Sequence, residues 1–231
     1  MWHNGKRQRE VSVLEKPKQI NEVDQDENEK TDEKKSFISE ARRAQIVDAA
    51  IKTLDEIGYI HASMAQIAKK AEISTALISY HFKDKNDLMD YTLTQLLSDM
   101  SSYVLERTQT ATTPRDKLRA YIEASIAYHA NKPEYNIALI EIVFHARTAN
   151  NVPYYKLDDD EENPLESELQ QILVAGQEKK EFGEFNVLAM ASAIRGAIDE
   201  YIFNRKLNGS IDPQSYSTEL VNLFYRAVLR E

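Results

Sequence analysis

The chain has 231 residues and a net charge of −9, and 42% of its residues are hydrophobic and 29% charged. The hydrophobic fraction is large enough to form a core, so this composition excludes a chain that is disordered throughout. It has no cysteine, which excludes a disulfide scaffold, a thiolate metal site and a cysteine nucleophile. Because no apolar run approaches the roughly 18 residues of a membrane span and residues 1–10 lack the apolar core of a signal peptide, we expect a soluble, cytoplasmic protein that does not bind membranes.

Residues 1–38 form a polar segment with almost nothing to bury. The stretch from Asn21 to Lys35 is acidic and rich in polar side chains. Because burial in such a segment does not offset the entropy lost on ordering, we predict a disordered polar tail over 1–38. An alternative gives Lys6, Arg7 and Arg9 a role in contacting nucleic-acid phosphates.

From Ser39 the spacing of apolar residues becomes helical. They recur at i, i+4, i+8 and i+11 on one helix face, as Ile46, Ala50, Leu54 and Ile57. Ser39 is a residue type that caps helix N-termini and Gly58 one that ends helices, so we predict a helix between them.

Two short helices and a longer one are predicted next. Ser63 and Gln66 have the spacing of a capping box, which indicates a helix start. Ser74 can cap a second short helix that runs to about His81, and Asp84 can cap the longer one. Compact helices joined by so short a turn are arranged as in a helix-turn-helix.

The remainder of the chain also has helical periodicity. We predict helices at about 84–108, 114–131, 134–149, 164–180, 187–206 and 213–230. Four of these begin near a proline, where a missing N–H costs little. Residues 150–163 are predicted as a loop that contains five consecutive acidic residues, 158–162.

An ordered set of residues over 42–88 carries a family resemblance. The set comprises Ile46, Ala49, Ala50, Gly58-Tyr59, Ser63-Met64-Ala65-Gln66-Ile67-Ala68, Ala71, Ile73-Ser74, Tyr80-His81-Phe82, Lys85 and Leu88. It resembles the TetR family of bacterial transcriptional repressors, and residues 194–199 resemble the eighth helix of that family. The resemblance implies an all-α fold with a helix-turn-helix DNA-binding domain over 39–84 and a helical effector-binding and dimerisation domain over 85–231.

The chain departs from the family pattern at three positions. Family members often have glycine at positions 72 and 76 and tyrosine at position 79, where this chain has Glu72, Ala76 and Ser79. If Glu72 is left-handed, it costs roughly 1–2 kcal/mol relative to glycine. The departures concern individual contacts and leave the module intact.

A recognition helix exposes short side chains to the major groove of DNA. Thr75 can hydrogen-bond a base edge, and Ala76 and Leu77 can contact a thymine methyl group. With the resemblance, we expect DNA contacts from Ser63, Thr75, Ala76, Leu77, Ser79, Tyr80, His81 and Lys85. The alternative is that Tyr80 and His81 pack at the helix end and that Lys85 is merely solvated.

The charge of this region is the main objection to DNA binding. Residues 36–90 carry 7 basic and 8 acidic residues, whereas phosphate contact usually needs a basic surface. DNA binding therefore requires the basic residues to gather on one face; they are Arg42, Arg43, Lys69, Lys70, Lys83 and Lys85.

The resemblance implies an effector pocket within residues 91–207. Pockets are mostly apolar with a few polar groups, and our candidates are Tyr103, Tyr121, Tyr128, Glu141, Phe144 and His145. Tyrosines at helical spacing are more often core residues, and Glu141 with His145 is more often a satisfied pair than a metal site. Acidic residues such as Glu123 and Asp199 raise the hypothesis of a cationic ligand, against the alternative of a neutral or acidic lipid-like one.

The resemblance implies a homodimeric repressor that an unknown small molecule releases from an inverted-repeat DNA operator. Helices 187–206 and 213–230 would pair with their copies and bury Ile194, Ile198, Ile202, Leu220, Leu223 and Phe224. Catalytic motifs are missing from the sequence, so we expect no enzyme, no cofactor and no metal. The alternatives are an architectural or division-linked DNA-binding member of this fold without an effector, and an all-α enzyme.

Overall fold

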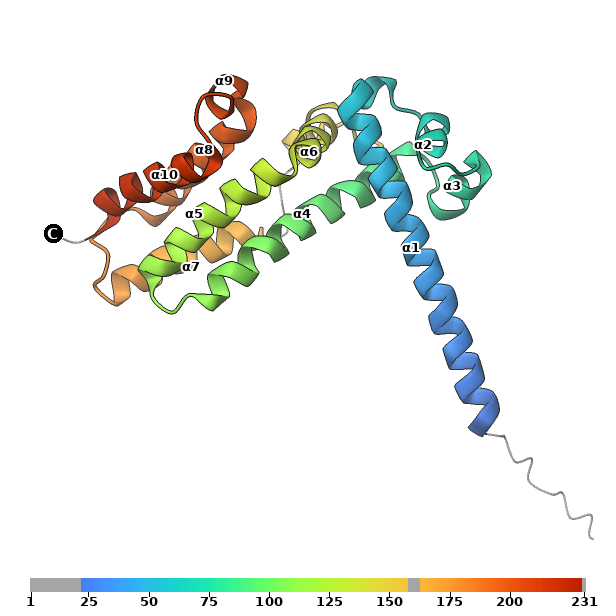
Figure 1. The fold of residues 1–231 in the computed structure, drawn as a ribbon, viewed down its shortest axis with the longest axis horizontal. Coiled ribbons are helices and arrows are strands. Elements are labelled where there is room, and N and C mark those ends of the chain that lie inside the picture. Colours follow the sequence, from blue (N-terminus) through green and yellow to red (C-terminus); the bar gives the residue numbers. More distant parts are fainter. Residues whose placement is uncertain (1–21, 158–162, 230–231) are drawn as a thin grey trace, which may run out of the picture. The chain divides into compact units, whose positions relative to one another are not determined.

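The computed structural model describes residues 22–157 and 163–229 (Figure 1). The chain divides into two units, Met1–Arg42 and Arg43–Glu231. The described part of the first unit is helical and forms the start of α1 (Glu22–His61). Among the described residues, no helix combines the length and the apolar character needed to cross a membrane.

Helix α1 begins well before the expected cap at Ser39. Residues 22–38 are helical in the structure, whereas the sequence predicts a disordered tail there, and residues 1–21 lie outside the described residues. The segment is rich in Glu and Lys, which are good helix formers. Extending an existing helix also avoids the cost of nucleating a new one, so a segment with few apolar residues can be helical.

The predicted helix stop at Gly58 is a break within α1. Gly58 has φ 72° and ψ 168°, a backbone conformation that is essentially restricted to glycine. The helix then resumes for one short turn to His61, and the Ala62 N–H donates to the Gly58 carbonyl at 3.1 Å.

Three predicted caps are confirmed in the helices that follow. Ser63 caps α2 (Met64–Lys70), Ser74 caps α3 (Thr75–His81) and Asp84 caps α4 (Lys85–Thr110), each accepting from a backbone N–H three residues on. Between α2 and α3, Glu72 has φ 56°, so the left-handed turn falls on a residue with a Cβ.

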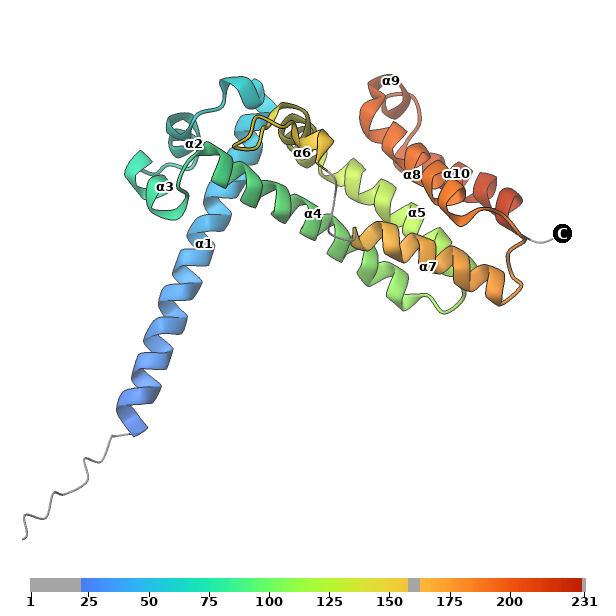
Figure 2. The ribbon, with the colours of Figure 1, turned by 180° about the vertical axis from the view of Figure 1, so that it is seen from behind.

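The remaining helices build a layered bundle around α5 (Pro114–Asn131). Helix α5 packs against α4, α7 (Pro164–Glu178), α8 (Val187–Phe203) and α10 (Pro213–Val228), and it lies between α4 and α10 in both views (Figures 1 and 2). Shorter elements complete the chain: α6 (Pro133–His145), the 3₁₀ turn η1 (Tyr154–Lys156) and α9 (Arg205–Asn208). The predicted all-α class is confirmed.

Two predicted helices end earlier than expected. Helix α6 stops at His145 because Ala146 has extended backbone angles. Helix α8 stops at Phe203 because Asn204 leaves the helical region, and α9 is a separate turn.

The second unit holds two hydrophobic cores, and α4 contributes to both. Leu88 and Leu96 of α4 lie in the first core with α1, α2 and α3, whereas Val104 lies in the second core with α5, α7, α8 and α10. Ala138 and Ile142 of α6 also belong to the first core. The cores therefore do not divide at residue 84, where the sequence predicts a domain boundary, because α4 and α6 complete the first core.

Candidate nucleic-acid interface and ligand cavity

Helix α3 is anchored on one face and exposed on the other. Ile78 is fully buried, and Phe82, directly after the helix, is 1% exposed. These two side chains hold α3 against the first core. The opposite face is open to solvent, and on it the Tyr80 side chain is 80% exposed.

The structure places the eight expected DNA-contacting residues at the start of α2, along α3 and at the start of α4. The exposed members are Ser63, Thr75, Ala76, Ser79 and Tyr80, and the half-buried members are Leu77, His81 and Lys85. The Tyr80 ring meets the His81 ring edge-on at 5.0 Å between centroids. Short side chains thus surround one protruding tyrosine.

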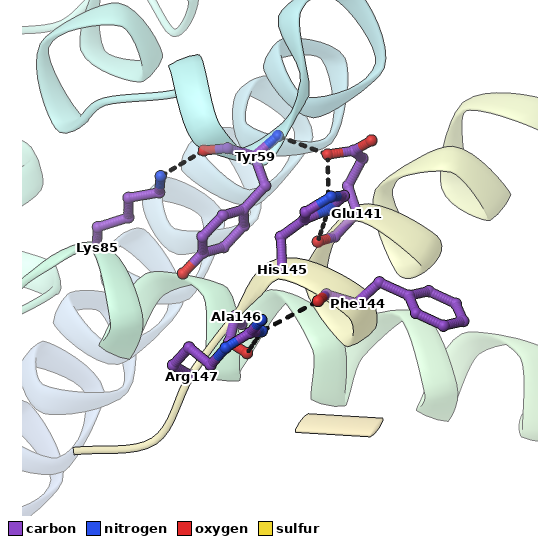
Figure 3. Close-up of polar contacts among 7 residues, drawn as sticks. All are labelled: Tyr59, Lys85, Glu141, Phe144, His145, Ala146 and Arg147. Atoms are coloured by element: carbon purple, nitrogen blue, oxygen red, sulfur yellow. Dashed lines mark hydrogen bonds and ion pairs between the residues drawn. The ribbon is translucent and has the colours of Figure 1, made fainter. Parts of the chain in front are cut away.

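Lys85 is engaged within the protein. Its ammonium group donates a hydrogen bond to the Tyr59 carbonyl and lies 3.9 Å from the centroid of the Tyr59 ring (Figure 3). Partial burial lowers the pKa of Lys85 below its usual value. The residue expected to neutralise phosphate therefore joins the start of α4 to the broken turn of α1.

The other basic residues do not all face solvent. Lys70 forms an ion pair with Glu56, and the Arg43 guanidinium stacks over the Phe82 and Tyr91 rings at 4.8 and 4.4 Å. Lys69 and Lys83 are exposed. The basic surface near α3 is consequently thinner than the count of basic residues suggests.

Glu141 and His145 lie at the break in α1 and do not line the cavity of about 530 Å³ that opens among the helices of the second core. The Tyr59 N–H donates to Glu141 Oε2 at 2.7 Å, and His145 Nδ1 lies 3.2 Å from the same oxygen (Figure 3). In the described parts of the chain, no three potential ligands lie close enough together to hold a metal ion. Glu141 and His145 thus satisfy each other as a pair. Their helical spacing predicts the pairing but not its location beside Tyr59.

Phe144, the third candidate on α6, also lies outside the cavity. Its ring stacks on Tyr155 of η1 at 5.8 Å between centroids and is 47% exposed. The Arg147 guanidinium donates to the Phe144 and Ala146 carbonyls and closes the end of α6 (Figure 3).

A cavity of about 530 Å³ opens among α4, α5, α7 and α8, a size within the usual range for small-molecule sites. Of the six expected pocket residues, only Tyr121 lines it. Tyr103 and Tyr128 pack against each other at 5.5 Å between ring centroids. They act as core side chains, the alternative that the sequence left open.

Polar residues line the cavity from several helices, among them Ser98 and Ser101 of α4. Tyr121, Ser125 and His129 of α5 are spaced at i, i+4 and i+8, and Arg195 and Asp199 of α8 at i and i+4. Each set therefore forms one stripe on its helix. Ser125 and Arg195 are not among the six residues expected to line the pocket. Their spacing of four residues from Tyr121 and Asp199 is the feature of the sequence that could have identified them.

The charges of the cavity wall are unevenly balanced. Arg195 is ion-paired with Glu166. Asp199 is half-buried, and burial raises its pKa, an effect that nearby Arg195 opposes. Burial likewise raises the pKa of the Tyr121 phenol, which therefore stays protonated and neutral.

Comparison with known proteins identifies the N-terminal part of the second unit. Residues 46–92 match the family model described as bacterial regulatory proteins, tetR family. The HTH-type transcriptional regulator BetI of Paraburkholderia phytofirmans (strain DSM 17436 / LMG 22146 / PsJN) is 39% identical over 87 residues, 37% of this chain and 45% of the relative. The match thus spans less than half the length of that curated relative.

Solved structures share the fold of most of the chain at low sequence identity. FadR of Bacillus subtilis in complex with stearoyl-CoA is 23% identical with a TM-score of 0.67, over 78% of this chain and 96% of that one. A tetR-family regulatory protein from Rhodococcus RHA1 is 19% identical with a TM-score of 0.69, over 82% and 98%. The family model thus identifies residues 46–92 as a segment similar to the DNA-binding domain of bacterial regulatory proteins of the tetR family, and the solved structures show a shared all-α fold.

Proposed function

We propose that this protein is a DNA-binding transcriptional repressor that a small molecule releases from an inverted-repeat operator. The observation that carries the proposal is the exposed face of α3, which lies inside the segment that matches the family model. A helix anchored by Ile78 and Phe82 and open on its other face suits insertion into the major groove.

The exposed residues of α3 suggest a division of roles on DNA. Thr75, Ala76 and Ser79 present short side chains that can approach base edges, and Leu77 can contact a thymine methyl group. Tyr80 is long enough to reach a phosphate. His81 and the capping Ser63 are further candidates for phosphate contact.

Two lysines that are not among the eight residues expected to contact DNA complete the proposed phosphate contacts. Lys69 and Lys83 are exposed near the ends of α2 and α3, whereas Lys85 is held by Tyr59. We therefore assign the main phosphate neutralisation to Lys69 and Lys83 and give Lys85 a supporting role.

The cavity supports control by a small molecule over an architectural protein without an effector. A tightly packed second core would leave no such space. Buried polar atoms usually have hydrogen-bond partners, and two atoms on residues that line the cavity, Ser125 Oγ and His129 Nε2, have none among the described residues. A ligand that prefers one conformation of the protein shifts the population toward it and so changes DNA affinity.

A homodimer through α8 and α10 fits the exposed apolar side chains. Of the six residues expected in the interface, Ile194, Ile198, Leu220 and Phe224 are buried in the chain's own second core, and only Leu223 is clearly exposed, at 57%. A helix that packs against both its own core and a partner has apolar residues on both faces. The spacing of apolar residues along α8 and α10 therefore does not distinguish core residues from interface residues. We propose that Leu188 and Leu223 form the contact.

A mobility-shift experiment tests DNA binding. The DNA is the upstream region of the protein's own gene, with random duplex as competitor. We expect a sequence-preferring complex that weakens steeply with salt, because phosphate contacts release counterions. Ala76→Glu should abolish it, because the new carboxylate meets the phosphate backbone and the base edges.

Gln109→Glu is the matched control, since it adds the same charge at an exposed position near the end of α4. The control should bind as the unaltered protein does. Equal binding of operator and random duplex, or full binding by the Ala76→Glu variant, would overturn the proposal.

A further inference from the structure

The orientation of His129 in the cavity wall is determined by Asn136. Asn136 Nδ2 donates to the His129 carbonyl at 2.9 Å, which turns Asn136 Oδ1 toward His129 Nδ1 at 2.8 Å. An amide oxygen only accepts hydrogen bonds, so Nδ1 carries the imidazole proton. The other ring nitrogen, Nε2, is therefore a hydrogen-bond acceptor.

This acceptor has no partner within the protein. His129 is 3% exposed, and its Nε2 makes no hydrogen bond to any described residue. The ring lines both the 530 Å³ cavity and an adjoining one of about 330 Å³. Ser125, one turn earlier on α5, has a fully buried hydroxyl that likewise lacks a partner among the described residues.

Asp199 of α8 supplies a second acceptor to the cavity. Its carboxylate lines the same cavity and has no hydrogen bond among the described residues, while the Glu166 carboxylate already balances Arg195. With His129 neutral, since burial lowers its pKa, the group Arg195, Glu166 and Asp199 carries one negative charge in excess. The cavity thus offers two acceptors, His129 Nε2 and the Asp199 carboxylate, and the second of them is an uncompensated anion.

We propose that the cavity binds a small protonated amine with an apolar body, its ammonium group paired with Asp199 and a further donor directed at His129 Nε2. The apolar body packs against Leu97, Leu139 and Ile202, which line the same space. A fatty carboxylate fits less well, because it places an anion beside Asp199 and brings an acceptor to an acceptor.

The inference rests on the proposed effector role of the cavity, but binding is measured without DNA. The probes are 4-phenylbutylamine, 4-phenylbutanol and 4-phenylbutyrate, which share a phenylalkyl body and differ in the polar group. Thermal melting and calorimetric titration of the full chain report binding, because a ligand specific for the folded state raises the melting temperature. We expect the amine to bind, the alcohol to bind more weakly and the carboxylate not to bind.

Variants identify the groups that recognise the amine. Asp199→Asn keeps the shape of the side chain and should weaken amine binding about tenfold or more, the usual effect of losing a charged hydrogen bond. Glu200→Gln, an exposed acid next along α8, is the matched control and should leave it unchanged. His129→Asn retains a donor toward Asn136 but removes the Nε2 acceptor, so it should also weaken binding.

The outcomes separate this inference from the proposed repressor. The inference is overturned if the carboxylate binds as tightly as the amine, if none of the three probes binds, or if both Asp199→Asn and His129→Asn bind normally while folded by circular dichroism. A failure to bind DNA leaves these measurements valid and overturns only the repressor. An amine that binds but never changes DNA affinity overturns the effector role alone.

Discussion

His129 is a buried imidazole whose protonation the fold resists. It is 3% exposed, and burial lowers its pKa below the ordinary value of 6.5, although the hydrogen bond with Asn136 opposes the shift. In the unfolded chain the same ring titrates near its ordinary value. As the pH falls through that value, the unfolded state takes up a proton that the folded state does not, so stability is lost.

This predicts a melting temperature that falls as the pH is lowered from 7.5 to about 5.5. His129→Asn should flatten the fall, because the variant has no imidazole to protonate at that position. His61→Asn is the control, since His61 is exposed. The account fails if the unaltered protein and the His129→Asn variant lose stability in parallel over this range.

Helix α1 is broken at Gly58, near its C-terminal end, and two other helices hold this break in place. Glu141 of α6 accepts the Tyr59 N–H, and Lys85 of α4 donates to the Tyr59 carbonyl. Both backbone groups of the residue after Gly58 are thereby satisfied by side chains from elsewhere in the chain. A Cβ on Gly58 would lie 3.2 Å from Glu141 Oε2, so glycine is needed both for its backbone angles and for space.

Gly58→Ala should therefore destabilise the protein by about 1–3 kcal/mol, the usual cost of such a backbone conformation in a residue with a Cβ. Urea denaturation followed by circular dichroism measures the change. Gly196→Ala is the control: an added Cβ there meets nothing within 4 Å, and alanine favours the helix by about 0.5–1 kcal/mol. Equal stability of the two variants would contradict this view of the break.

What the sequence could predict was local. Ser63, Ser74 and Asp84 were recognised as caps because a cap needs only a side chain and the next three residues. Glu141 and His145 were correctly paired by spacing, but spacing along α6 does not say which distant element faces them, and the partner Tyr59 lies 82 residues away in sequence. The helical start at Glu22 differs from the prediction because strong helix formers such as Glu and Lys can extend a helix through a segment with few apolar residues.

At the scale of the whole molecule, the proposed homodimer uses exposed apolar side chains on α8 and α10. Leu188 is 61% exposed and Leu223 is 57% exposed, and large exposed apolar surfaces commonly mark protein interfaces. In a two-fold dimer the same patch meets its own copy, so each such residue is used twice.

The double variant Leu188→Glu/Leu223→Glu should consequently be monomeric, since four carboxylates would enter one interface, while its helical circular dichroism is retained. Light scattering coupled to size exclusion measures the mass. Val174→Glu, at a 41% exposed position on α7, should remain dimeric. A folded, dimeric double variant would place the interface elsewhere.

The sharing of α4 between two cores has a consequence for how the second unit unfolds. Leu88 and Leu96 belong to one core and Val104 to the other, yet all three lie on a single uninterrupted helix. Melting either core exposes apolar residues of α4 and weakens the helix that the other core needs. The two cores therefore lose their structure cooperatively, as one folding unit, although their side chains form separate clusters.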